Sequence, residues 1–127
     1  MGGRGTFASG NAVAYKYETV GTISNVKILE PINKKGSWKL PEEAHSSSAY
    51  VLLDKNGMFR VYREYDSSHH LKIEIAYHVE TSLDKSGAKV LHMHTYDKNF
   101  NRSKARLLTS KEYSRYKIFL KGIENER

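Results

Sequence analysis

The sequence lacks cysteine entirely, and this absence excludes several kinds of chemistry. Disulfide bonds, thiolate metal ligands and a cysteine nucleophile are all ruled out. A chain without cysteine also suits a reducing compartment. Long apolar runs are missing too: no run approaches the ~20 residues that cross a bilayer, and residues 1–11 lack the apolar core of a secretory signal. We therefore expect a soluble protein with no membrane partner.

Acidic residues are fewer than basic ones in this chain. There are 14 Asp and Glu against 21 Lys and Arg, which gives a formal net charge of +7. Such an excess favours a phosphate-rich partner such as RNA, and it also serves solubility in proteins that bind no nucleic acid. The length of 127 residues suits one domain with its own core.

Glycine and small polar residues dominate the start of the chain, and β-prone runs dominate its middle. This composition predicts a flexible glycine-rich head over residues 1–13, a single domain over 14–123 and a frayed tail over 124–127. Strands are predicted at 14–23 with a break at Gly21, at 25–32, in two runs within 49–66, at 71–78 and at 89–96. Between them, residues 33–48 form a loop that Trp38 and Leu40 anchor to the core. The fold class is α+β, with an antiparallel sheet of five or six strands and a C-terminal helix.

Two local signals fix a turn and a helix. Asn56-Gly57 supplies the positive φ values that a tight hairpin turn demands, which predicts a hairpin within residues 49–66. Thr109 stands three residues before Glu112, which is the spacing of a capping box, and Gly122 is placed to end a helix. Residues 109–122 are therefore predicted to be helical.

Strict alternation marks residues 71–78 and 89–96 as two strands with one apolar face each. Side chains of a strand point alternately to opposite faces, so a register that aligns the apolar faces also fixes the polar ones. Leu71, Ile73, Ile75 and Tyr77 are expected on one face with Leu91 and Met93. Glu74, His78, His92 and His94 are expected together on the opposite, solvent-exposed face.

Three imidazoles and a carboxylate in one place can perform two kinds of chemistry. Histidine is both acid and base near neutral pH, so the group could cleave a phosphodiester by general acid/base catalysis. RNA suits this reaction because its 2′-hydroxyl is a built-in nucleophile. We expect His78, His92, His94 and Glu74 to be catalytic with no cofactor. A divalent metal bound by the same residues is the second hypothesis, and ordinary surface histidines are the third.

Phosphate binding requires cations near the cleavage site. The candidates on or beside the predicted strands and in the basic stretch 101–106 are Arg60, Arg63, Lys72, Lys104 and Arg106. The stretch 101–106 is also compatible with a solvated loop.

The order of several motifs resembles a known family. "YVLLDKNGMFRVYREYD" leads into "KIEIAYH", a spacer and "VLHMHTYD", over residues 48–97, with "GGRG" as a weaker match near the start. This order is similar to the C-terminal toxin-like domain of phage head morphogenesis (minor capsid) proteins and polymorphic toxin-like proteins. That group is placed with ribonuclease-like toxins of the barnase/colicin/RelE type, small α+β folds around an antiparallel sheet. The matching positions are Tyr65, Asp66, Glu74, His78, His92, His94 and Asp97.

The resemblance implies a phage- or prophage-associated ribonuclease. Its partners would be RNA, a phage head or portal protein and an immunity protein. It would act in the cytoplasm of a bacterial host or be carried in a phage particle. The alternative that the resemblance leaves open is a non-catalytic accessory or interaction domain of a phage head protein.

Overall fold

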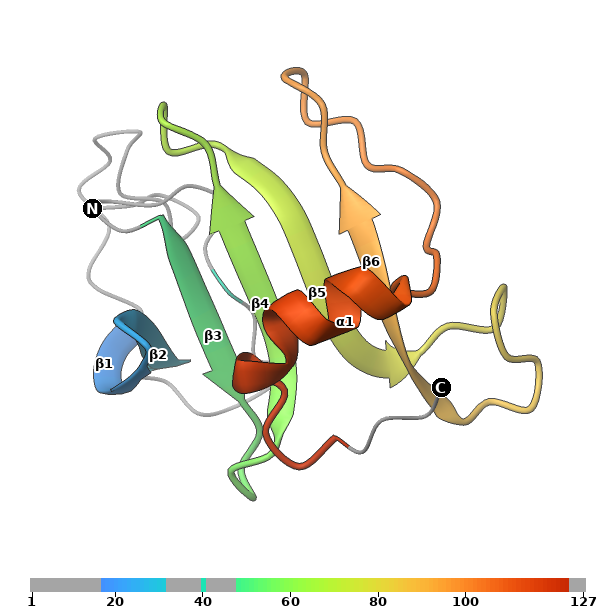
Figure 1. The fold of residues 1–127 in the computed structure, drawn as a ribbon, viewed down its shortest axis with the longest axis horizontal. Coiled ribbons are helices and arrows are strands. Elements are labelled where there is room, and N and C mark those ends of the chain that lie inside the picture. Colours follow the sequence, from blue (N-terminus) through green and yellow to red (C-terminus); the bar gives the residue numbers. More distant parts are fainter. Residues whose placement is uncertain (1–16, 32–39, 41–47, 124–127) are drawn as a thin grey trace.

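The computed structural model describes residues 17–31, residue 40 and residues 48–123. It contains a six-stranded sheet in the order β1-β2-β3-β4-β5-β6 and a short C-terminal helix, so the predicted α+β class is confirmed (Figure 1). The predicted head, the predicted tail and Trp38 lie outside the described residues. The elements are β1 Tyr17–Ile23, β2 Val26–Pro31, β3 Ala49–Leu53, β4 Phe59–Tyr65, β5 Leu71–Val79, β6 Lys89–Thr95, α1 Ser110–Tyr116 and the 3-10 helix η1 Lys117–Phe119.

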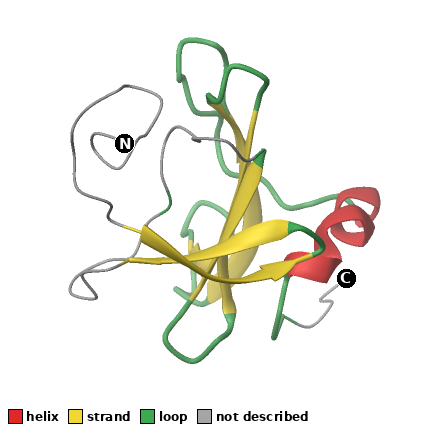
Figure 2. Ribbon diagram, turned by 90° about the vertical axis from the view of Figure 1, so that its left-hand side faces the viewer, coloured by secondary structure: helices red, strands yellow, loops and turns green. Residues whose placement is uncertain are grey.

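One strand pair departs from the predicted antiparallel arrangement. β2 and β3 are parallel, and the other four neighbouring pairs are antiparallel. A parallel pair needs a connection of about a dozen residues or more, and the chain between Pro31 and Ala49 is long enough. Figure 2 shows that β1 and β2 run across the direction of the other strands, so the sheet is strongly twisted.

The β1–β2 hairpin turns at Ser24 and Asn25, not at Gly21. Both turn residues have positive φ, 49° and 69°, which is the backbone of a type I′ turn. The predicted break at Gly21 is wrong because β1 continues through this residue. The pairing shifts register between Thr19 and Gly21, so the glycine marks a bulge.

The β3–β4 hairpin is confirmed, but its connection is longer than a two-residue turn. Residues 54–58 link the strands, and Gly57 has a φ of 81°. The carboxylate of Asp54 accepts hydrogen bonds from the backbone N–H groups of Asn56 and Met58, at 2.8 and 3.0 Å. Hydrogen bonds from an aspartate side chain to the backbone of the residues that follow it stabilise this wider loop.

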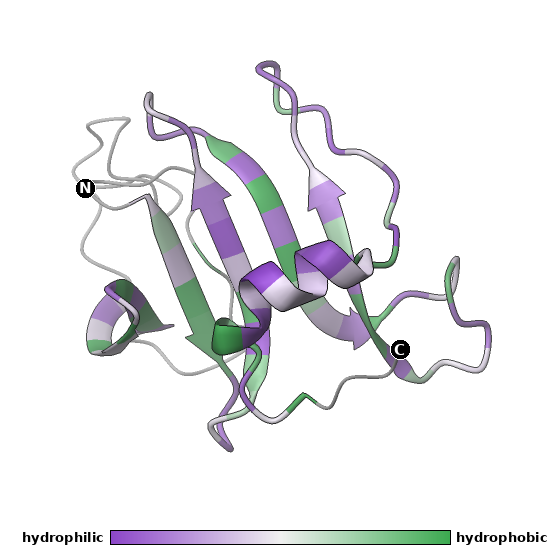
Figure 3. Ribbon diagram, in the orientation of Figure 1, coloured by the Kyte–Doolittle hydropathy of each residue, from purple (hydrophilic) through white to green (hydrophobic). Residues whose placement is uncertain are grey.

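The sheet buries apolar side chains on both faces, and β5 alternates in hydropathy along its length (Figure 3). On the α1 face lie Ala49, Val51, Phe59, Tyr62, Ile75, Met93, Leu108, Tyr116, Phe119 and Leu120. On the opposite face lie Leu29, Leu40, Tyr50, Leu52, Val61, Tyr65, Leu71 and Ala76. Leu40 is thus in the core as predicted. Leu71 is on the face opposite to the predicted one, because a register shift between Glu64 and Tyr65 sets Leu71 against Tyr65.

The C-terminal helix begins as predicted and ends early. The Thr109 hydroxyl accepts the Glu112 N–H at 3.1 Å, and the Glu112 carboxylate accepts the Thr109 N–H at 2.9 Å, which completes the capping box. The α-helix ends at Tyr116 and tightens into η1, whereas the sequence predicted helix to residue 122. The tighter turn brings both Phe119 and Leu120 into the core.

Candidate histidine site

The pairing of β5 with β6 places the predicted polar side chains on one face. Glu74 pairs with His94, Ala76 with His92 and His78 with Val90, while Ile75 pairs with Met93 on the face that α1 covers. Because neighbours in register share a face, Glu74, His78, His92 and His94 lie on the same side of the sheet. The predicted grouping is confirmed.

The predicted exposure of this face is wrong. His92 is 0% exposed, His94 4% and Glu74 8%, whereas His78 is only partly buried. The reason is that this face carries its own apolar cluster, which includes Ala76 directly opposite His92. The histidines therefore belong to a buried polar group at the edge of a core.

The imidazole rings contact each other in a row. The centroids of His78 and His92 are 4.7 Å apart with the planes at 81°, and those of His92 and His94 are 5.3 Å apart at 87°. Both contacts are edge to face, with His92 between the other two rings.

Each ring has one nitrogen engaged by a backbone carbonyl. Nδ1 of His92 lies 2.8 Å from the Val90 oxygen, and Nδ1 of His94 lies 2.9 Å from the Ser103 oxygen. Nδ1 of His78 lies 3.0 Å from the Val79 oxygen. A carbonyl oxygen can only accept, so the proton is on Nδ1 in each ring. In the neutral rings Nε2 therefore carries the lone pair.

The carboxylate that lies close to the imidazoles is that of Glu80. The sequence did not predict this residue as part of the site. One ligand atom each from Glu80, His92 and His94 lies within 4.8 Å of the others. Glu80 follows Glu74, Ala76 and His78 at a spacing of two, just beyond the end of β5. Extending the alternation past the strand would have found it.

Burial, hydrogen bonds and nearby charges shift two pKa values in the site. Burial lowers the pKa of His92, and the neighbouring His78 and His94 rings lower it further against the opposing hydrogen bond to Val90. The pKa of Glu80 is below its ordinary value, first because the Ser82 hydroxyl donates to its carboxylate at 2.8 Å and then because His92 and His94 are near. His92 thus favours its neutral form and Glu80 its charged form.

Glu74 is bound to Arg63 and not to the histidines. Nη2 and Nε of Arg63 both lie 2.8 Å from Glu74 Oε2, and Nη1 donates to the Leu40 oxygen at 3.0 Å. The two side chains lie between β4 and β5 on the histidine face. This contact gives both residues a structural role, and their predicted catalytic and phosphate-binding roles stay predictions.

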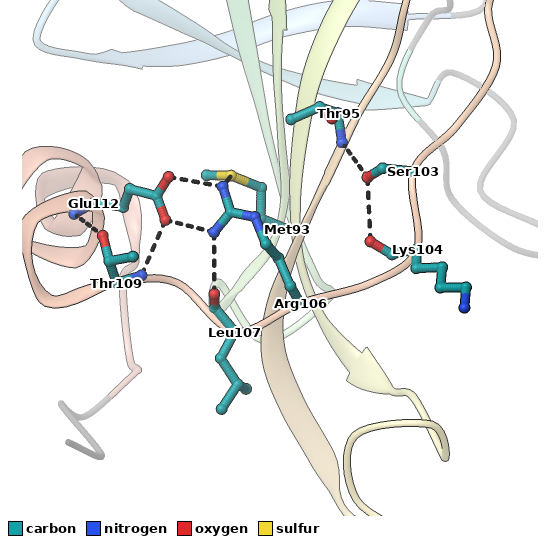
Figure 4. A network of polar contacts seen from close by, with 8 residues as sticks. All are labelled: Met93, Thr95, Ser103, Lys104, Arg106, Leu107, Thr109 and Glu112. Carbon is teal, nitrogen blue, oxygen red and sulfur yellow. Dashed lines mark hydrogen bonds and ion pairs between the residues drawn. The ribbon is translucent and has the colours of Figure 1, made fainter.

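Two more of the predicted phosphate ligands form ion pairs with carboxylates. Lys72 Nζ lies 3.2 Å from Glu64 Oε2. Arg106 forms a two-pronged ion pair with Glu112, at 2.8 Å for each pair of atoms, and also contacts Met93 Sδ (Figure 4). Lys104 is exposed and Arg60 partly exposed. Lys72 and Arg106 are exposed as well, so their ion pairs lie at the surface.

The remaining residues of the family resemblance have local structural roles. Asp66 accepts the N–H groups of Ser68 and His70, which shapes the β4–β5 turn. Asp97 does the same for Asn99 and Asn101 after β6. Tyr65 is buried edge to face against Tyr50, with the ring centroids 5.6 Å apart.

Comparison with known proteins gives no relative: no family model, curated protein or solved structure matches this chain. Within the described part of the chain, no helix has the length and apolar character needed to span a membrane.

Proposed function

We propose that this protein is a phage- or prophage-associated ribonuclease whose site is the histidine cluster. The observation that carries the proposal is the row of three imidazoles in contact, each oriented by a backbone carbonyl at Nδ1. Held rings with free Nε2 lone pairs suit proton transfer, because an oriented base loses no entropy when it acts. The net charge of +7 supports a polyanionic substrate.

Burial divides the roles among the three rings. His78 is partly exposed, whereas His92 and His94 are buried, so His78 is the ring that meets substrate. His78 Nε2 takes the proton of the 2′-hydroxyl as the 2′-oxygen attacks phosphorus. The bond from phosphorus to the 5′-oxygen then breaks, the proton passes to that oxygen, and a 2′,3′-cyclic phosphate forms. His92, in contact with His78, holds the ring in place.

RNA cleavage by purified protein tests the proposal. A labelled oligonucleotide should yield a 2′,3′-cyclic phosphate product, and His78→Ala should reduce the rate by about 10²-fold or more. His69→Asn is the matched control, since His69 lies in the β4–β5 turn and its φ of 70° suits asparagine. An all-deoxy oligonucleotide should not be cleaved, because it lacks the nucleophile. Full activity of His78→Ala, or no cleavage by the wild type, would overturn the proposal.

The second candidate function is a non-catalytic accessory or interaction domain of a phage head protein. The observation that favours it is that the predicted site residues already make contacts within the fold. His92 and His94 are buried, and Arg63, Lys72 and Arg106 have carboxylate partners. A protein of this kind would leave RNA intact and would bind purified capsid or portal protein. Toxicity on expression in a bacterial cytoplasm, relieved by an immunity protein, would instead support the ribonuclease.

A further inference from the structure

We propose that Glu80, His92 and His94 bind a divalent transition metal ion of the Zn²⁺ class. The three residues come from two places in the sheet: His92 and His94 alternate along β6, and Glu80 follows the end of β5. One ligand atom from each lies within 4.8 Å of the others. Ligands at ~2.1 Å from a tetrahedral ion are ~3.4 Å apart, so the three ligand atoms would move closer together by up to about 1.4 Å when the ion binds.

The hydrogen bonds of both histidines match those of metal ligands. Nδ1 of His92 donates to the Val90 oxygen at 2.8 Å, and Nδ1 of His94 donates to the Ser103 oxygen at 2.9 Å. In metal sites the nitrogen that does not bind the ion almost always donates to a carbonyl or carboxylate, which fixes the ring and leaves the other lone pair for the metal. Here two different carbonyls perform this task independently.

One buried nitrogen of the group lacks a hydrogen-bond partner among the described residues. His92 is 0% exposed, and its Nε2 is the one buried side-chain nitrogen or oxygen within the described residues that lacks a partner. A buried polar atom without a partner is unfavourable, and native structures rarely keep one without a function. A metal ion bound to Nε2 satisfies this atom.

The ligand set selects the kind of ion. Two imidazoles and one carboxylate are ligands of Zn²⁺, Co²⁺ or Fe²⁺, whereas Ca²⁺ and Mg²⁺ prefer oxygen ligands alone. Three protein ligands leave at least one coordination position for water or substrate. His78 contacts His92 and is not one of the three ligands, so it stays available for proton transfer. Metal binding does not depend on RNA cleavage, so metal titration in the absence of RNA tests it separately.

Calorimetric titration of the full chain with Zn²⁺, and absorption spectroscopy with Co²⁺, test the site. We expect one ion per chain, visible Co²⁺ bands and a higher melting temperature with Zn²⁺. Glu80→Gln, a loop substitution outside the core, should weaken binding by at least about tenfold while the metal-free melting temperature is unchanged. His94→Ala should weaken it further.

The control is the double variant His69→Asn/His70→Asn, which removes two neighbouring histidines that lie outside the histidine cluster. It should bind both ions as the wild type does. The proposal is overturned if the wild type binds neither ion, if Glu80→Gln binds as tightly as the wild type, or if the control variant loses binding.

Discussion

Arg63 and Glu74 form an ion pair that links β4 to β5, with 2.8 Å between Nη2 and Oε2 and only 14% and 10% of the side chains exposed. Removing one partner leaves the other charge nearly buried, so Glu74→Gln should lower the free energy of unfolding by about 3 kcal/mol, at the lower end for buried pairs. Urea denaturation measures this effect.

The double variant Arg63→Met/Glu74→Leu is the matched comparison. It removes both charges and should recover most of the lost stability, because neither buried charge remains. If Glu74→Gln were as stable as the wild type but lost RNA cleavage, the structural role of Glu74 would be wrong.

The sequence predicted which side chains of β5 and β6 share a face, whereas it could not predict whether that face is buried. Alternation has a period of two, so aligning Ile75 with Met93 fixes the opposite face without any tertiary information. What covers that face depends on residues far away in sequence, such as Leu40 and Tyr50. The sequence therefore predicted which side chains meet and not whether solvent reaches them.

Glu80 and the parallel β2–β3 pair were missed for two other reasons. Glu80 was assigned to a connection, although it continues the alternation of β5. The order of strands in a sheet leaves no mark on local periodicity, so nothing in residues 25–32 indicated that β2 would run parallel to β3. The resemblance to phage-linked ribonucleases likewise indicated turn residues, such as Asp66 and Asp97, without separating them from catalytic ones.

The capping box makes a prediction about the stability of α1. Thr109→Ala removes the acceptor of the Glu112 N–H and should lower the free energy of unfolding by about 1 kcal/mol. Ser110→Ala is the control, since Ser110 is exposed at the first helical position and should change stability by less than ~0.5 kcal/mol. Equal effects of the two substitutions in thermal or chemical denaturation would contradict a specific cap.

Glu112 makes the free energy of unfolding depend on pH in the acid range. Arg106 first, with the Thr109 N–H, lowers the pKa of Glu112 from 4.5 to about 2 in the folded protein. A carboxyl with a lowered folded pKa adds stability above its unfolded pKa, and this contribution is lost as the pH falls from about 4.5 to about 2. Denaturation from pH 6 to pH 2 should therefore show a shallower acid decline for Glu112→Gln. An identical decline for both proteins would be the contrary result.

The β1–β2 turn can be stabilised. Ser24 and Asn25 both have positive φ, which costs less for asparagine and glycine than for serine. Ser24→Asn/Asn25→Gly should raise the free energy of unfolding by about 0.5–1 kcal/mol. Asn25→Val should lower it by about 1 kcal/mol or more, because a β-branched residue is strained there. A loss of stability in the Asn-Gly variant would show that the turn has another geometry.

Salt dependence tests whether the basic excess binds RNA. Affinity should fall steeply between ~50 and ~200 mM salt, because each neutralised phosphate releases counterions. Lys104→Ala should reduce the slope of log K against log salt by about 1. Arg106→Gln should change the slope less and the stability more, because Glu112 already binds this guanidinium. RNA affinity that does not change with salt concentration would indicate that the excess of basic residues serves solubility alone.

The tautomers of the histidine rings decide most directly whether the cluster is a functional centre. Nuclear magnetic resonance correlation of ring protons with ring nitrogens, on metal-free protein near neutral pH, reports which nitrogen carries the proton. We predict that the neutral forms of His92 and His94 both carry the proton at Nδ1, and that Zn²⁺ shifts both Nε2 resonances. A proton on Nε2 of either ring, or Nε2 resonances that Zn²⁺ leaves unchanged, would contradict it.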